Sequence, residues 1–141
     1  MFALLVPATS ADAECIALWK DGPDALERST LVFSGTVISG HGVEVIFDVD
    51  RVWKGNLERK TTLWLMPGME MITFDKGTEG KTYLVFASFL KMFSSPDLRR
   101  ADGSSPGEVA LFEISSCSPT RPLANAQELV RQIGSGKPPR N

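Results

Sequence analysis

The two cysteines are the residues of this chain with the most informative chemistry, because they stand near its two ends. Cys15 follows Ala11-Asp12-Ala13-Glu14, and Cys117 is followed by Ser118-Pro119-Thr120. Two cysteines allow one intramolecular disulfide, and closing a loop of about 100 residues contributes roughly 4–5 kcal/mol in the chain-entropy description. Such a bond requires an oxidising compartment. The alternative is two unpaired thiols, one buried and one close to the N-terminus.

The other side chains that could do chemistry do not form a recognised catalytic or metal-binding pattern. His41 is the only histidine and stands between two glycines in a predicted turn, whereas a zinc site needs several converging ligands. Asp48 and Asp50 share one face of a predicted strand and could act as a general acid and base, but the solvated outer face of a barrel is the favoured explanation. The sequence also lacks a nucleophile elbow, a Cys/His pair and a zincin motif. We therefore predict that the protein is not an enzyme and has no metal or cofactor.

Composition argues against two classes of partner. The chain has 141 residues, a net charge of −2 and an isoelectric point near 5.4, so the basic surface of a nucleic-acid-binding protein is missing. No apolar run reaches the roughly 20 residues of a transmembrane helix.

The hydrophobic content of 43% predicts one globular domain. We expect its aromatic side chains in the core, although a barrel could also use them to stack on bases.

The N-terminal segment resembles the end of a secretory signal peptide. Residues 2–8 are largely apolar, and Ala11-Asp12-Ala13 fits the small-x-small rule for cleavage. We therefore predict that residues 1–13 are a signal-peptide remnant, with cleavage after Ala13, and that the mature protein is secreted or periplasmic. The alternative is a retained N-terminal segment that is partly buried.

Five segments have the composition and periodicity of β-strands. The clearest alternates Val43, Val45, Phe47 and Val49 with charged residues, which predicts one buried and one solvated face. An interruption at Arg51-Val52 predicts a β-bulge. A run that is apolar on both faces predicts a central or barrel-closing strand at residues 83–90. The five predicted strands cover residues 31–38, 43–53, 61–66, 83–90 and 108–114.

These strands and one helix define the predicted fold. The helix is expected from about Asn125, with Asn125 and Glu128 at capping-box spacing and Gly134 as its stop. Together the elements predict a mainly β protein, a five-stranded OB-fold-like barrel with a C-terminal helix. The long connections at residues 67–80 and 91–107 are candidate functional loops. We place the domain at residues 14–134 and expect residues 135–141, rich in Gly, Pro and Lys, to be a disordered tail.

Four stretches of the sequence carry a family resemblance. Thr30–Val37 contains apolar-apolar-Phe-x-Gly-x-Val, Val45–Gly55 ends in Val-Trp-Lys-Gly, Gly80–Ala87 begins Gly-x-x-Tyr-Leu-Val, and Cys117–Leu123 begins Cys-x-x-Thr. In this order they resemble the OB-fold family of netrin modules and tissue inhibitors of metalloproteinases, the TIMP-like or NTR domains. The resemblance spans most of the predicted domain and implies the same barrel.

The resemblance also implies how the cysteines are used. The mature inhibitors begin Cys-x-Cys, and their first cysteine chelates the protease zinc through its α-amine and carbonyl while a disulfide holds it to a middle loop. Here that end has only Cys15, and residues 69–77, which match the loop that carries the partner cysteine in the inhibitors, contain no cysteine. Cys15 then corresponds to the second family cysteine and pairs with Cys117. Cleavage after Glu14 would instead make Cys15 the chelating residue, but the small-x-small pattern disfavours it.

The function implied by this resemblance is that of an exported, non-enzymatic binding module. Its partner-binding segment is expected at Glu14, Cys15, Ile16 and Ala17, together with the long loops. Its partner is expected to be an extracellular or envelope protein, with a protease among the candidates. Metalloprotease inhibition is the less favoured part of this expectation, because the chelating cysteine is missing. The alternative is a cell-envelope domain that binds carbohydrate or peptide.

Overall fold

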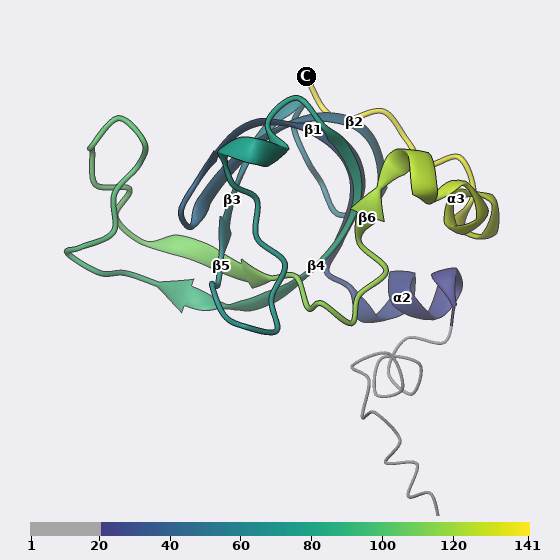
Figure 1. Cartoon of the computed structure of the whole chain (residues 1–141), viewed down its shortest axis with the longest axis horizontal. Coiled ribbons are helices and arrows are strands. Elements are labelled where there is room, and N and C mark those ends of the chain that lie inside the picture. The colour runs from purple at the N-terminus through teal and green to yellow at the C-terminus, as the bar shows by residue number, and fades with distance from the viewer. Residues whose placement is uncertain (1–20) are drawn as a thin grey trace, which may run out of the picture.

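Strand pairing closes the central part of the chain into a barrel. The computed structural model describes residues 21–141, and its five barrel strands are β1 (Leu31–His41), β2 (Glu44–Lys54), β3 (Lys60–Leu65), β4 (Thr82–Phe93) and β5 (Val109–Glu113). Neighbours follow the order β1-β2-β3-β5-β4, and β4 then pairs with β1 to complete the ring (Figure 1). All of these pairs are antiparallel except β3 with β5. The predicted mainly β fold, a five-stranded barrel with a C-terminal helix, is confirmed.

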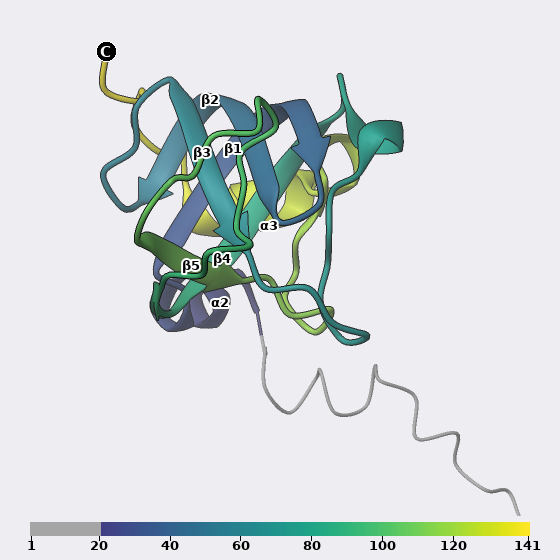
Figure 2. The same ribbon diagram turned by 90° about the vertical axis from the view of Figure 1, so that its left-hand side faces the viewer.

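The other described elements are short and lie around the barrel. They are α2 (Gly22–Arg28), the 3₁₀ helix η1 (Lys76–Thr78), β6 (Arg121–Pro122), the 3₁₀ helix η2 (Leu123–Asn125) and α3 (Gln127–Ile133). Both α-helices cover the same side of the barrel (Figure 1). Figure 2 shows the C-terminal end of the chain returning to the side of β2.

The barrel interior is filled by aromatic and β-branched side chains. The rings of Phe33, Phe47, Phe74 and Tyr83 pack edge to face in one row, with successive centroids 5.1, 5.3 and 5.0 Å apart. Such edge-to-face pairs stabilise the fold by more than the burial of their surface area alone. Alternation along β2 places Val45, Phe47 and Val49 inward, as its sequence pattern predicts. Aromatic residues therefore fill the core, as expected.

A second apolar layer joins the barrel to the two helices. Val32, Leu84 and Phe86 point outward from β1 and β4 and pack with Ala25 of α2 and with Ala126. This layer explains why residues 83–87 are apolar on both faces, because one face fills the barrel and the other supports the helices. Trp53 belongs to the same layer, and its Nε1 donates a hydrogen bond to the Gly134 carbonyl over 2.7 Å.

The start of the C-terminal helix differs from the prediction. Asn125 ends η2 rather than capping α3, and the residue before α3 is Ala126, which makes no side-chain cap. Ala126 is buried against the second apolar layer, and its N–H donates to the Leu123 carbonyl over 3.0 Å. Tertiary packing therefore sets this boundary in place of a capping box. Gly134 ends the helix at a φ of 91°, as predicted.

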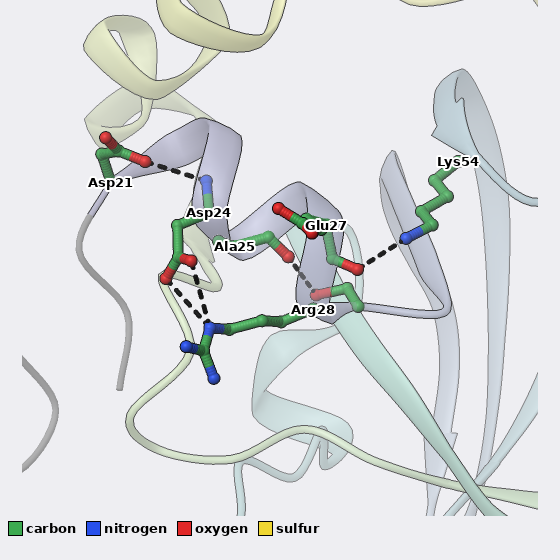
Figure 3. Close-up of polar contacts among 7 residues, drawn as sticks. Asp21, Asp24, Ala25, Glu27, Arg28 and Lys54 are labelled. Carbon is green, nitrogen blue, oxygen red and sulfur yellow. Dashed lines mark hydrogen bonds and ion pairs between the residues drawn. The ribbon is translucent and has the colours of Figure 1, made fainter. Parts of the chain in front are cut away.

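Helix α2 was not predicted from the sequence, although its capping signal is present. The Asp21 carboxylate accepts the Asp24 N–H over 2.8 Å, and Arg28 forms an ion pair with Asp24 one turn away over 3.1 Å (Figure 3). At the other end, the Lys54 ammonium donates to the carbonyls of Leu26 and Glu27. A cation at a helix C-terminus satisfies carbonyls that lack intrahelical partners.

Residues 135–141 are not the disordered tail that their composition predicted. The N–H of Val52 donates to the Lys137 carbonyl, and the N–H of Lys137 donates to the Val52 carbonyl, each over 2.7 Å. Arg140 adds backbone bonds to Leu57 and Arg59. β3 pairs with β2 only from Glu44 to Asp48, so the tail supplies partners for the edge of β2 that β3 leaves open.

The end of β2 is bulged, close to where the sequence predicts it. Its register with β1 shifts at Asp50 and again at Trp53, on the two sides of the predicted Arg51-Val52 interruption. Each bulge increases the local twist of the strand. The bulge at Asp50 shifts the alternation of the strand, so that Val52 lies in the barrel core and Trp53 faces the helices.

Candidate functional site

Of the residues predicted for the partner-binding segment and the disulfide, Cys117 alone lies within the described residues 21–141. Glu14, Cys15, Ile16 and Ala17 lie outside the described residues. Cys117 is half-buried in the turn between β5 and β6, where its N–H donates to the Ser115 hydroxyl over 3.0 Å. The Ser118 N–H donates to the Ser115 carbonyl over 2.9 Å and closes the turn. The Cys117 turn is therefore a defined structure at one edge of the barrel.

Thr120 anchors this turn to the barrel. Its buried hydroxyl accepts the Phe86 N–H over 2.8 Å and also the Ser118 hydroxyl over 2.9 Å. Beyond it, β6 pairs Arg121 with Leu84. The threonine of the Cys-x-x-Thr pattern thus satisfies a backbone donor of β4 that would otherwise be buried without a partner.

A loop that is distant in sequence lies beside the Cys117 turn. The Ile72 N–H donates to the Ile114 carbonyl over 2.7 Å, and the Ser116 N–H donates to the Glu70 carbonyl over 2.8 Å. Residues 67–73 form this part of the first long connection, and we call them the middle loop. Met69 near its tip is fully exposed. The middle loop and the Cys117 turn together form one continuous edge.

The far end of β4 leaves the barrel and forms an arm with β5. The last pair of β4 with β1 is Ala87 with Leu31, whereas pairing with β5 continues from Ser88 to Phe93 (Figure 1). Figure 1 shows the arm projecting to the left. The predicted barrel-closing strand at residues 83–90 is confirmed, because β4 pairs with β1 up to Ala87, but Phe89 and Leu90 lie past the last of these pairs.

The arm exposes three large apolar side chains. Phe89, Leu90 and Met92 are 46%, 38% and 51% exposed, and we call them the arm patch. The Phe89 ring packs edge to face on Phe112, with centroids 5.8 Å apart, and the Phe112 carbonyl accepts the Met66 N–H. The base of the arm is therefore connected to the strand that precedes the middle loop.

The opposite face of the arm is covered by the second long connection. Trp64, Val109 and Leu111 are buried there, and Phe93 and Leu98 pack against them. The Glu44 carboxylate, only 4% exposed, accepts the Ala101 N–H over 3.0 Å and fastens this loop to the start of β2. Within the loop, hydrogen bonds from Ser104 hold the pKa of Asp102 below its usual value. Sequence alternation placed Glu44 on an outer face but gave no sign that a loop covers it.

The carboxylates and the histidine that the sequence singled out lie on solvated surfaces. Asp48 and Asp50 are exposed on β2 and line, with Arg59, a small polar cleft of about 280 Å³. His41 is exposed at the end of β1. Within residues 21–141, no group of three His, Cys, Asp or Glu side chains is arranged to hold a metal ion.

The described helices and the comparisons with known proteins each give one finding. No helix among residues 21–141 has the length and apolar character needed to cross a bilayer. No family model, no curated protein and no solved structure matches the chain.

Proposed function

We propose that this protein is an exported, non-enzymatic binding module of the TIMP-like OB class, which binds an extracellular or envelope protein through one end of its barrel. The arm patch is the observation that carries this proposal. Large apolar side chains exposed together on one projecting element are typical of surfaces that bind other proteins. The middle loop with Met69 and the Cys117 turn extend the proposed surface.

The proposed disulfide would bring the N-terminal segment to the same end. No free cysteine occurs among the described residues, and Cys15 is the only other cysteine of the chain. A bond from Cys15 to Cys117 would place Glu14, Ile16 and Ala17 beside the middle loop. Because the first family cysteine is missing, we expect this segment to contact a partner without rigid chelation of a metal. The protein should therefore bind a protease while slowing its cleavage of substrate only slightly.

The binding proposal is tested with the purified full exported chain and a panel of extracellular zinc metalloproteases. We expect micromolar binding to at least one protease, measured by biolayer interferometry, with little slowing of peptide cleavage. The variant Phe89→Ser/Leu90→Ser/Met92→Ser should lose at least tenfold in affinity. Ile38→Ser is the matched control, because Ile38 is equally exposed at 47% but lies on β1. Unchanged binding by the triple variant, or no binding across the panel, would contradict the proposal.

Export and the disulfide are tested together by mass spectrometry of exported protein prepared without reductant. We expect a chain that begins at Glu14 and is about 2 Da lighter than its reduced form, which corresponds to the two hydrogens lost on oxidation. Free thiols in that material, or a chain that keeps residues 1–13, would remove the support for this part of the proposal.

A further inference from the structure

A second surface of the molecule is a groove on the α3 side of the barrel. Its volume is about 770 Å³, and it lies between the first turns of α3, the segment around β6 and the start of β4. In Figure 1 this side is opposite the arm, so the groove is separate from the arm patch. The lining residues that matter for its chemistry are Lys81, Thr82, Pro122, Leu123, Gln127 and Val130.

The walls of the groove are apolar and are held by the core beneath them. Leu123 and Val130 are half-buried, and both pack on the second apolar layer beside Leu84 and Phe86. Pro122 contributes an apolar ring and has no N–H to donate. A ligand would therefore meet an apolar surface that already exists before binding, which lowers the entropy lost on association.

Within the described part of the chain, the one charged residue that lines the groove is cationic. Lys81 is exposed, and none of the ion pairs among the described residues includes it. Its backbone is fixed, because its N–H donates to the Thr78 carbonyl and its carbonyl accepts the Val37 N–H. No carboxylate of residues 21–141 lines the groove. The groove is therefore complementary to a ligand with a negative charge at one end and apolar groups elsewhere.

We infer that this groove binds an aliphatic chain that ends in a carboxylate. The carboxylate would lie at Lys81, and the hydrocarbon would lie along Leu123 and Val130. A peptide fits less well, because its backbone amides need partners along their whole length. β6 already occupies the edge of β4 at Tyr83 and Leu84, and the Thr82 hydroxyl is hydrogen-bonded to Thr36 over 2.7 Å. An acyl chain has polar atoms only at one end.

Isothermal titration calorimetry of the full chain with dodecanoate, below the concentration at which it forms micelles, tests this inference. We expect saturable binding of one molecule per chain. Affinity should rise with chain length from octanoate to dodecanoate by up to about fourfold per methylene group, the value for full burial. Lys81→Gln should weaken binding about two- to fivefold, as expected for a solvent-exposed ion pair. Lys76→Gln is the control with the same change of charge, because Lys76 lies outside the groove.

Two variants block the groove without disturbing the core. Ala124 and Gln127 are exposed residues of its wall, so Ala124→Trp and Gln127→Trp should fold normally and should each lower dodecanoate affinity at least tenfold. Dodecyltrimethylammonium, which has the same chain and the opposite charge, should bind more weakly than dodecanoate. Equal binding of the two amphiphiles, unchanged binding by both tryptophan variants, or binding of an acetylated leucine-terminated peptide in preference to dodecanoate would overturn the inference.

Discussion

Thr120 shows at the residue scale how one hydroxyl holds two parts of the chain together. It is buried, and its oxygen accepts the Phe86 N–H from β4. Thr120→Val keeps the shape of the side chain but leaves that N–H without a partner. We expect the free energy of unfolding to fall by about 1–3 kcal/mol, measured by urea denaturation. Thr120→Ser keeps the acceptor and should lose less than Thr120→Val; an equal loss in both variants would show that the methyl group dominates.

Glu44 fastens the second long connection, and its removal should free that loop. Arg99 and Arg100 are exposed tryptic sites close to the Ala101 N–H that Glu44 accepts. We expect Glu44→Ala to raise the rate of tryptic cleavage after these arginines about tenfold, because a hydrogen bond to a charged group contributes about 1.5–3 kcal/mol. Glu44→Gln keeps an acceptor oxygen, so trypsin should cleave this variant at a rate much closer to that of the parent chain. Equal rates in all three proteins would contradict this role.

The candidate site was only partly predictable from single residues. The solvated positions of Asp48, Asp50 and His41 follow from alternation and from the lack of converging ligands. The burial of Glu44 does not, because it depends on a loop more than 50 residues away in the chain. The exposure of Phe89 and Leu90 depends in turn on where β1 begins, and an apolar sequence has the same appearance on a covered strand as on an uncovered one.

At the scale of elements, Gly40 determines how closely β1 approaches the chain before η1. A Cβ atom at this position would lie 2.6 Å from the Phe74 carbonyl oxygen and 2.7 Å from that of Asp75. Gly40→Ala should therefore lower the free energy of unfolding by about 1–3 kcal/mol, because backbone has to move. Gly68→Ala is the control, since its nearest atom is a flexible Met71 side-chain carbon at 3.4 Å. Thermal unfolding of the two variants makes the comparison, and equal melting temperatures would refute it.

The strands were predictable as elements because their alternation and composition are local properties. The helices were less predictable than the strands. α3 begins where Ala126 meets the second apolar layer, and that packing overrides the capping-box spacing of Asn125 and Glu128. α2 has a local signal in Asp21 and Pro23, but seven residues carry too little periodicity to separate a helix from a turn.

At the scale of the whole molecule, the C-terminal tail behaves as part of the barrel. Deletion of residues 136–141 removes the backbone bonds to Val52, Leu57 and Arg59. We expect the free energy of unfolding to fall by about 1–3 kcal/mol, since each net bond contributes about 0.5–1.5 kcal/mol and ordering of the tail offsets part of the sum. Deletion of Asn141 alone should change nothing measurable in the same urea titration. If both deletions were neutral, the tail would not stabilise the fold.

The tail was not predictable from composition, because a Gly- and Pro-rich segment has no core-forming side chains. The tail is ordered because it pairs with the edge of β2 beyond the β2–β3 pairing, where backbone groups would otherwise lack partners. The barrel itself could be predicted because the number and spacing of strands leave few ways to bury their apolar faces.

The pairing that closes the barrel also sets the order in which the molecule can fold. β1 meets β4 only when residues 82–87 are available, and Val52 meets the tail only when Lys137 is available. Folds built from such distant pairings reach the native state in milliseconds to seconds. A chain that emerges N-terminus first therefore presents the β1–β2 hairpin without the rest of the barrel while residues 55–113 are synthesised, and Phe33 and Phe47 stay open to wrong partners until β4 and β5 arrive.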